Sequence, residues 1–386
     1  MDPVFSPVRL GPATVRNRIV KAATFEAATP GGVVTDRLVE FHRRHAEGGV
    51  GMTTVAFCAV SPEGRTDRDA MWLHPEVAAG LRTVTDAVHE AGAAASVQLG
   101  HAGPVANARS NQLPALGPGR FFNPLGMRRT RFATEADLTR VTAAYGTAAL
   151  LAADAGFDAV ELHFGHNYLI SAFLSPLLNR RDDRYGGPLH NRARLALEVA
   201  RTVREAVGDR IAVTAKLNMD DRVRGGFGIE ESVQVAAWLQ EAGTVDALKL
   251  TAGSSLLNPM AIFTGDAPVR EFAAAFPKPA GWGLRVSGRA FLREYPFREA
   301  YLLDRARRFR AELSLPLILL GGVTSKSTMD TALAEGFDLV AMARALLIEP
   351  DLPARLRADP TVQSRCTHCN LCVPTIYTRT HCPVTA

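Results

Sequence analysis

Two histidines and a tyrosine stand close together in the chain, directly after an apolar run that has the length of a buried strand. His163 and His166 are three residues apart, and Tyr168 follows two residues later. Imidazole rings donate hydrogen bonds, and a phenol supplies a proton. The spacing therefore predicts a site that polarises a carbonyl group and transfers a proton nearby.

A second group of reactive side chains lies near the C-terminal end. Four of the five cysteines fall within the last 21 residues with the spacing C-x2-C-x2-C-x9-C: Cys366, Cys369, Cys372 and Cys382. In a reducing compartment, thiols at such spacing favour metal ligation over disulfides. They suit either one tetrahedral ion or an iron–sulfur cubane. The spacing leaves a [4Fe-4S] cluster, zinc and no metal as alternatives.

The composition is that of an ordinary globular protein. Apolar residues make up 47% and charged residues 22%, and the net charge of +5 is spread along the chain. This spread argues against nucleic-acid binding. No basic and apolar leader and no apolar run of membrane-spanning length occurs, so we expect a cytoplasmic protein without a membrane partner. A homo-oligomer is expected only because dimers are common.

Short apolar runs alternate with segments of helical spacing from one end of the chain to the other. Eight such runs predict strands at 19–23, 52–57, 95–99, 159–162, 212–217, 247–251, 317–320 and 339–341. Helices are predicted at 35–48, 75–91, 135–155, 191–207, 229–241, 301–311 and 327–335. This alternation predicts the α/β class and a single (β/α)8 TIM barrel.

We place the barrel domain at residues 1–360 and a Cys-rich tail, packed on the barrel, at 361–386. The Gly- and Pro-rich stretches at 103–126 and 252–290 are expected to be loops over one barrel face.

Side chains that follow the strands should converge at one mouth, because barrel active sites lie at the carboxyl ends of the strands. Gln98 ends the third run and Lys216 the fifth, beside the histidines that follow the fourth. The loops after the last two strands commonly bind phosphate. Here those loops contain Gly321 and Gly322, and then Ala343 and Arg344.

Several segments together resemble the old yellow enzyme family of FMN-dependent oxidoreductases, over nearly the whole chain from Phe5. The most specific is 173–194, with FLSP, NRRDDRYGG and NRAR, which is similar to the family's long signature after the fourth strand. LGP at 10–12, NRIV at 17–20, GVG at 49–51 and SPEGR at 61–65 resemble its first two strands and the loop that follows.

The resemblance implies a role for each matching residue. His163 and His166 would hold the substrate oxygen, and Tyr168 would be the proton donor. Residues that would contact FMN are the ring-backing Ala23, Thr24 and Phe25, the polar-edge residues Gln98 and Lys216, and the phosphate-binding Gly321, Gly322, Ala343 and Arg344. A cation such as Lys216 would stabilise the reduced flavin. Phe25 stands where many relatives have Cys or Thr, which implies a non-covalent flavin.

For the tail, the resemblance favours a [4Fe-4S] cluster, as in the branch with trimethylamine dehydrogenase and 2,4-dienoyl-CoA reductase, although the last cysteine gap looks shorter here. A cluster would imply an external electron donor, since no dinucleotide-binding region follows. We expect an ene-reductase in which NAD(P)H reduces FMN, and FMN reduces the C=C bond of an α,β-unsaturated carbonyl compound. The alternatives are an iron–sulfur flavoprotein of the dienoyl-CoA reductase or amine dehydrogenase type, and a non-catalytic flavin- or metal-binding barrel.

Overall fold

The computed structural model describes residues 2–123, 127–276, 278 and 280–385. Of the loops expected at 103–126 and 252–290, residues 124–126, 277 and 279 lie outside this described part.

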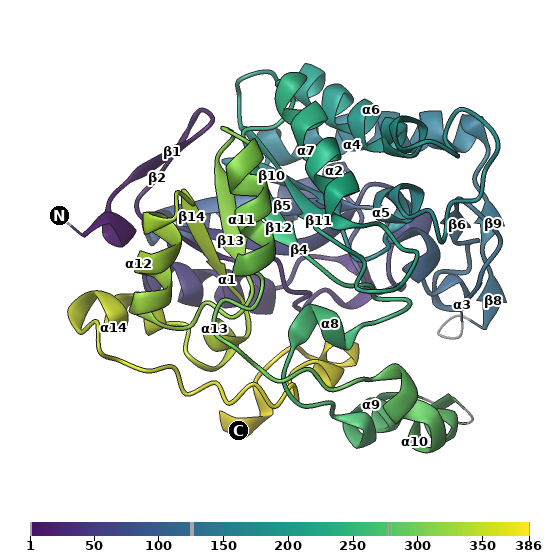
Figure 1. Ribbon diagram of the computed structural model, residues 1–386. Coiled ribbons are helices and arrows are strands. Elements are labelled where there is room, and N and C mark those ends of the chain that lie inside the picture. The colour runs from purple at the N-terminus through teal and green to yellow at the C-terminus, as the bar shows by residue number, and fades with distance from the viewer. Residues whose placement is uncertain (1, 124–126, 277, 279, 386) are drawn as a thin grey trace.

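Eight of the described strands form a closed parallel barrel (Figure 1). In the order in which neighbours pair, the barrel consists of β10 (Ala159–Phe164), β11 (Ala212–Asn218), β12 (Ala247–Thr251), β13 (Leu317–Leu320), β14 (Leu339–Met342), β3 (Ile19–Lys21), β4 (Met52–Ala59) and β5 (Ala94–Gly100), which pairs with β10. The predicted barrel is confirmed. Its strands read as nearly continuous apolar runs because both faces are buried, and every residue of β4 is buried.

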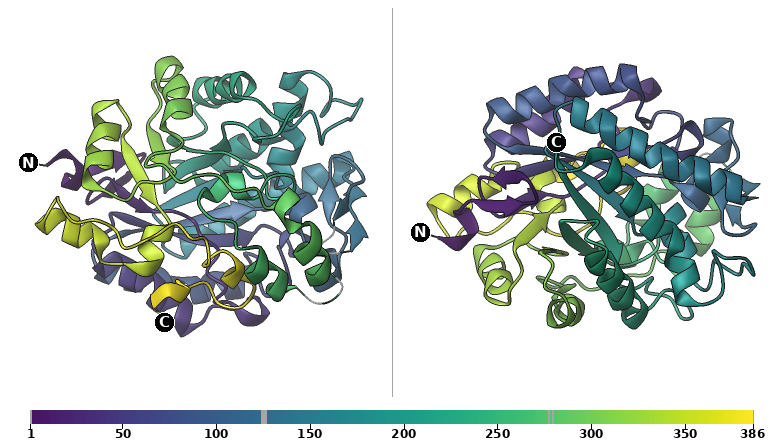
Figure 2. Two further views of the ribbon diagram at one scale, coloured as in Figure 1. Left: turned by 60° about the horizontal axis from the view of Figure 1, so that its bottom comes forward. Right: turned by 90° about the horizontal axis from the view of Figure 1, so that it is seen from above.

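Helices follow the strands and cover the outside of the barrel, as Figure 2 shows from two further directions. They are α1 (Asp36–Glu47), α2 (Pro75–Glu90), α4 (Glu135–Asp154), α6 (Leu189–Val207), α7 (Ile229–Glu241), α11 (Leu303–Glu312) and α12 (Lys326–Ala334), and after β14 come α13 (Arg344–Ile348) and α14 (Leu352–Ala358). Capping residues set several starts; Thr35 and Thr134, for example, each accept from a backbone N–H in the first turn.

A hairpin closes the barrel at the amino ends of its strands. It consists of β1 (Val8–Leu10) and β2 (Ala13–Val15), which pair antiparallel. Leu10 and Val15 are fully buried in one apolar cluster with Ala212, Ala247 and Leu339, which begin or nearly begin their strands. Since the hairpin covers this end, the opposite end of the barrel is the one that is free to carry a site.

Long connections cover the carboxyl ends of the strands. The one after β5 contains α3 (Ala108–Asn111), β6 (Leu116–Gly117), β7 (Phe122–Asn123), β8 (Arg128–Arg129) and β9 (Arg131–Phe132). The one after β12 contains α8 (Met260–Phe263), α9 (Val269–Ala275) and α10 (Ala280–Phe291). In the tail, the 3-10 helix η5 (Pro374–Tyr377) lies near α9, and the rings of Tyr377 and Phe276 are 4.8 Å apart. Within the described residues, no helix is both long and apolar enough to cross a bilayer.

Candidate active site

The two histidines and the tyrosine meet at the carboxyl end of β10. His163 belongs to this strand, His166 lies in the turn after it, and Tyr168 immediately precedes the short helix α5 (Leu169–Leu174). The ring centroids of His163 and Tyr168 are 4.5 Å apart, and those of the two histidines are 5.2 Å apart. The Phe57 ring also packs against Tyr168, and the centroids of these two rings are 5.6 Å apart. The structure therefore brings together the three side chains that the sequence singled out.

Residues at the ends of the next two strands hold the turn in place. His166 and Asn167 adopt positive φ angles of 61° and 57°, a conformation that needs support from the surroundings. The side-chain oxygen of Asn218, which ends β11, accepts from the His166 backbone N–H at 3.1 Å. His166 Nε2 lies 2.9 Å from Oγ1 of Thr251, which ends β12. The Thr251 hydroxyl thus orients the imidazole ring.

The electrostatic surroundings keep the three groups neutral at ordinary pH. Burial, assisted by the Lys216 charge, lowers the pKa of His166 to about 3. Burial and the neighbouring His166 hold the pKa of His163 well below its usual value, and burial raises that of Tyr168. Among the described residues, His163 Nδ1 is buried without a hydrogen-bond partner. Each ring can therefore act as a neutral hydrogen-bond donor, and the phenol keeps its proton until a substrate takes it.

Below these groups, one carboxylate organises the polar side chains inside the barrel. Glu161 Oε1 accepts from the Gln98 side-chain amide at 2.6 Å and lies 3.3 Å from Lys216 Nζ, while its other oxygen pairs with Lys249. All four side chains are at least 95% buried. The paired lysines lower the pKa of Glu161 despite its burial. The carboxylate thus fixes Gln98 and Lys216, and two cations face one anion.

Sequence reasoning missed Glu161 and Lys249 as members of this site. Their signal was available, because each is a charged residue within an otherwise apolar strand, and such residues are rarely buried without a partner. The sequence does not reveal the register of the strands. In the structure, Glu161 of β10 lies opposite Gln98 of the neighbouring β5. On the other side of β10, β11 separates it from β12, which carries Lys249. Thr251 was missed as well, since threonine is common in strands and gives no distinct signal.

The predicted flavin-facing segment follows β3. Ala23 packs against an apolar cluster that contains Ala56 and Phe57, next to Tyr168. Thr24 Oγ1 is buried and has no hydrogen-bond partner in the described part of the chain. The Phe25 carbonyl accepts from the Thr380 hydroxyl, so the tail reaches this segment. An orphaned hydroxyl at the barrel mouth is consistent with a ligand that would satisfy it.

The two glycines predicted to bind phosphate adopt conformations that suit the role. Gly321 and Gly322 have φ angles of 105° and 76°. A Cβ on Gly322 would lie 2.8 Å from the carbonyl oxygen of Arg298, and one on Gly321 would lie 2.6 Å from the Leu302 side chain. Only glycine fits here, and a glycine loop lets an anion approach the backbone N–H groups.

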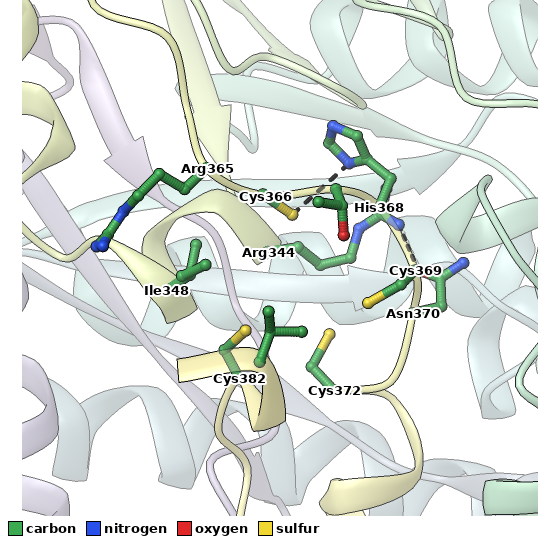
Figure 3. A pocket seen from close by; sticks show the side chains of 11 residues that line it. Arg344, Ile348, Arg365, Cys366, His368, Cys369, Asn370, Cys372 and Cys382 are labelled. Carbon is green, nitrogen blue, oxygen red and sulfur yellow. Dashed lines mark hydrogen bonds between the residues drawn. The ribbon is translucent and has the colours of Figure 1, made fainter. Parts of the chain in front are cut away.

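Ala343 and Arg344 lie at the start of α13, but the Arg344 side chain points toward the tail. Its guanidinium donates to the Thr264 carbonyl at 2.7 Å and to the side-chain oxygen of Asn370. Figure 3 shows Arg344 among the cysteines. Arg344 therefore connects the start of α13 with the loop after β12 and with the Cys-rich segment.

The four tail cysteines line a single pocket, and in Figure 3 their sulfur atoms face a common space. Burial raises the pKa of Cys366, and that of Cys372 to about 12, so a bound metal would have to displace their protons. Within the described residues, no three His, Cys, Asp or Glu side chains are grouped closely enough to hold a metal ion. Four thiols around one pocket are a donor set that occurs in both iron–sulfur and zinc centres. Cys58, by contrast, is buried in the core, as its apolar surroundings predict.

Comparison with known proteins agrees with this geometry. Residues 3–256 match the model of the NADH:flavin oxidoreductase / NADH oxidase family. The chain belongs to this family, which includes the old yellow enzymes, binds FMN and uses NAD(P)H. It is therefore an NAD(P)H-dependent flavin oxidoreductase.

Three individual similarities add detail. The chain is 50% identical over 381 residues to a 4,4′-dithiodibutanoate disulfide reductase of Rhodococcus erythropolis, covering 99% of this chain and 94% of that protein. It is 32% identical to a metal reductase of Desulforamulus reducens, covering 96% of this chain but only 51% of that longer protein. An old yellow enzyme homologue from Zymomonas mobilis superposes with a TM-score of 0.75 at 21% identity, over 99% of this chain and 97% of that one, and shows the shared fold.

Proposed function

We propose that this protein reduces the C=C bond of α,β-unsaturated carbonyl compounds with NAD(P)H. The observation that carries the proposal is the cluster of His163, His166 and Tyr168 at the barrel mouth, with its ring centroids about 5 Å apart. FMN, held by the predicted cofactor-binding residues, would supply the hydride for the β-carbon, with NAD(P)H as the reductant. The remaining tasks are to polarise the carbonyl and to protonate the α-carbon.

The protein's own side chains perform both tasks. The neutral imidazoles of His163 and His166 donate hydrogen bonds to the carbonyl oxygen, where negative charge develops as the β-carbon gains hydride. The Tyr168 Oη–H then gives its proton to the α-carbon, which completes the addition of two hydrogens across the double bond. Glu161 holds Lys216 and Gln98 where the flavin's polar edge would lie, so that the nearby positive charge favours the reduced cofactor.

The test is to replace both histidines by alanine and to measure each half-reaction separately without oxygen. We expect the His163→Ala/His166→Ala protein to retain FMN and to be reduced by NAD(P)H, but to transfer hydride to cyclohexenone at least about 100-fold more slowly. The control is His190→Ala, which removes an exposed histidine on α6. Unchanged enone reduction by the double variant would overturn the proposal.

A second candidate, reduction of organic disulfides, is favoured by the 50% identity to the Rhodococcus disulfide reductase. In that reaction the electron pair from NAD(P)H breaks the S–S bond, and two protons convert the sulfurs into two thiols. No carbon is protonated, so Tyr168 is less critical. Re-oxidation of the reduced protein by 4,4′-dithiodibutanoate and by cyclohexenone, followed side by side, decides between the two substrate classes.

We further propose that the four tail cysteines hold a [4Fe-4S] cluster and that the protein works in the cytoplasm, where NAD(P)H is available. The proposal is supported by the single pocket that all four cysteines line and by the C-x2-C-x2-C-x9-C spacing in the sequence. With a cluster, an external protein could donate electrons as well. Iron and acid-labile sulfide analysis of anaerobically purified protein tests it: about four irons per chain supports the cluster, whereas zinc or no metal contradicts it.

A further inference from the structure

A second cavity lies outside the reactive cluster, between the loops that follow β11 and β12. Its volume is about 260 Å³, and three arginines line it: Arg222, Arg298 and Arg305. Leu302 and Arg305 belong to the start of α11, whose first turn forms one wall. The cavity is too small for a whole cofactor but large enough for one end of an elongated molecule.

The charge of the cavity is only partly compensated. Asp220 pairs with Arg305 at 2.7 Å and lies 3.9 Å from Arg222. Arg298 forms no ion pair with any described residue. Three arginines, of which Arg298 is exposed, therefore line a cavity with one carboxylate beside it, an arrangement that attracts a further anion.

Two hydroxyl-bearing side chains line the same cavity as the arginines. They are Thr264, which is 8% exposed, and Tyr301. The two side chains interact with each other. The cavity wall therefore offers hydroxyl groups as well as arginines to an oxygen atom of a ligand.

The cavity is coupled to the reactive cluster through one short turn. The Ser255 backbone N–H donates to the His166 carbonyl at 3.1 Å. Three residues on, the Asn258 side-chain amide donates to the Arg222 carbonyl at 2.9 Å and to Tyr295 Oη at 2.8 Å. Tyr295 and Arg222 both line the cavity. One hydrogen-bonded turn therefore connects the residues of the cavity with His166.

We propose that this arginine cavity binds the anionic end, a carboxylate or a phosphate, of a molecule whose other end reacts beside His163 and His166. The inference rests on the proposed function, because it assumes that substrates bind at the histidine pair. The anion has two sources: the carboxylate of an acidic substrate, or the 2′-phosphate of NADPH. Bidentate pairing with guanidinium groups suits both.

The first experiment measures binding instead of turnover. Phenols perturb the flavin spectrum when they bind at the histidine pair, so the probes are 4-hydroxyphenylalkanoates of increasing chain length and their uncharged amides, titrated into the oxidised holoprotein. At one chain length we expect the acid to bind about 10- to 100-fold more tightly than the amide, the range for hydrogen bonds to charged groups. In Arg298→Gln this preference should fall to near unity, with full flavin content. Arg201→Gln, an exposed site on α6, is the matched control.

The second experiment compares NADPH with NADH in reducing the flavin of the same three proteins. If wild-type protein prefers NADPH over NADH and only Arg298→Gln loses this preference, the cavity binds the coenzyme phosphate. If instead only Arg298→Gln loses the preference for the acid over the amide, the cavity binds the carboxylate of the substrate. If Arg298→Gln alters neither preference, or if it loses FMN, the inference is wrong. If wild-type protein binds neither the phenols nor cyclohexenone, the proposed function fails, and the coenzyme comparison alone then decides the role of the cavity.

Discussion

Replacing Glu161 by Gln should destabilise the protein strongly, because it leaves two buried lysines without their anion. Lys216 Nζ lies 3.3 Å from Glu161 Oε1, and Lys249 pairs with the other oxygen. At that distance one pair is worth about 5 kcal/mol with an effective dielectric constant of about 20. Removing one partner of a buried pair typically costs about 3–5 kcal/mol. We therefore predict a loss of about 3–5 kcal/mol, which lowers the melting temperature of a chain of this length by about 4–6 °C.

The pH dependence of the Glu161→Gln variant gives an independent check. Burial already lowers the pKa of Lys216, and removing Glu161 removes the charge that counteracts this effect. The folded variant then binds fewer protons than the unfolded chain between the lowered pKa and the usual lysine pKa of about 10.4, so its stability should rise with pH in that window. In the wild-type protein the pKa of Glu161 is lowered, so its contribution is present above about pH 4.3 and is lost as the pH falls.

Thermal melts of the apoprotein at several pH values test both parts. Glu205→Gln, an exposed site on α6, should change stability by less than about 0.5 kcal/mol. Adding Lys249→Met to Glu161→Gln should restore part of the loss, because only one unpaired cation remains. The reasoning would be refuted by a variant that melts with the wild-type protein at neutral pH, or by one whose stability falls as the pH rises toward 10.

Four further outcomes follow from the site. Tyr168→Phe should slow enone reduction by about 10²–10⁴-fold yet leave disulfide reduction nearly unchanged, which stopped-flow re-oxidation measures. Thr251→Val, which keeps the shape but removes the hydroxyl 2.9 Å from His166, should lower enone kcat/KM by about 10-fold with FMN retained. Because the pKa of His166 is about 3, kcat/KM should show no histidine titration between pH 5 and 8; a step near about 6.5 would contradict this. Gly322→Ala should lose FMN, measured as the flavin-to-protein ratio, whereas Gly187→Ala, with nearly the same φ of 77° but open space around it, should retain FMN.

The barrel could be predicted from the sequence because each strand is buried on both faces and so forms a separate apolar run. The ends of the strands were also predictable to within about two residues. The strand predicted at 212–217, for example, is observed as Ala212–Asn218. The predicted strand ends thus put His163 and Lys216 near the carboxyl ends of two neighbouring strands, as in β10 and β11 of the structure. The connections were not predictable, because elements such as β7 and β8 have two residues each and are held by tertiary contacts.

Partners that come from distant strands were equally inaccessible. His166 depends on Thr251, which lies 85 residues later in the chain. The pairing of Glu161 with Lys249 spans 88 residues and depends on the curvature of the closed barrel. Sequence patterns reveal which residues are buried, but they do not reveal which buried charges face one another. That information appears only when the strands are in register.

The tail is integrated with the predicted cofactor-binding loops. Asn370 donates to the carbonyls of Thr264 and Asp266 at 3.1 and 2.9 Å, and its side-chain oxygen accepts from Arg344. Thr264 in turn lines the arginine cavity. Asn370, which lies between Cys369 and Cys372, therefore contacts both the loop that forms this cavity and Arg344, the arginine predicted to bind phosphate. Whatever orders the cysteines must also order these two contacts. The Cys-rich segment therefore helps to fix the position of Arg344 and of the loop at Thr264, independently of any electron transfer.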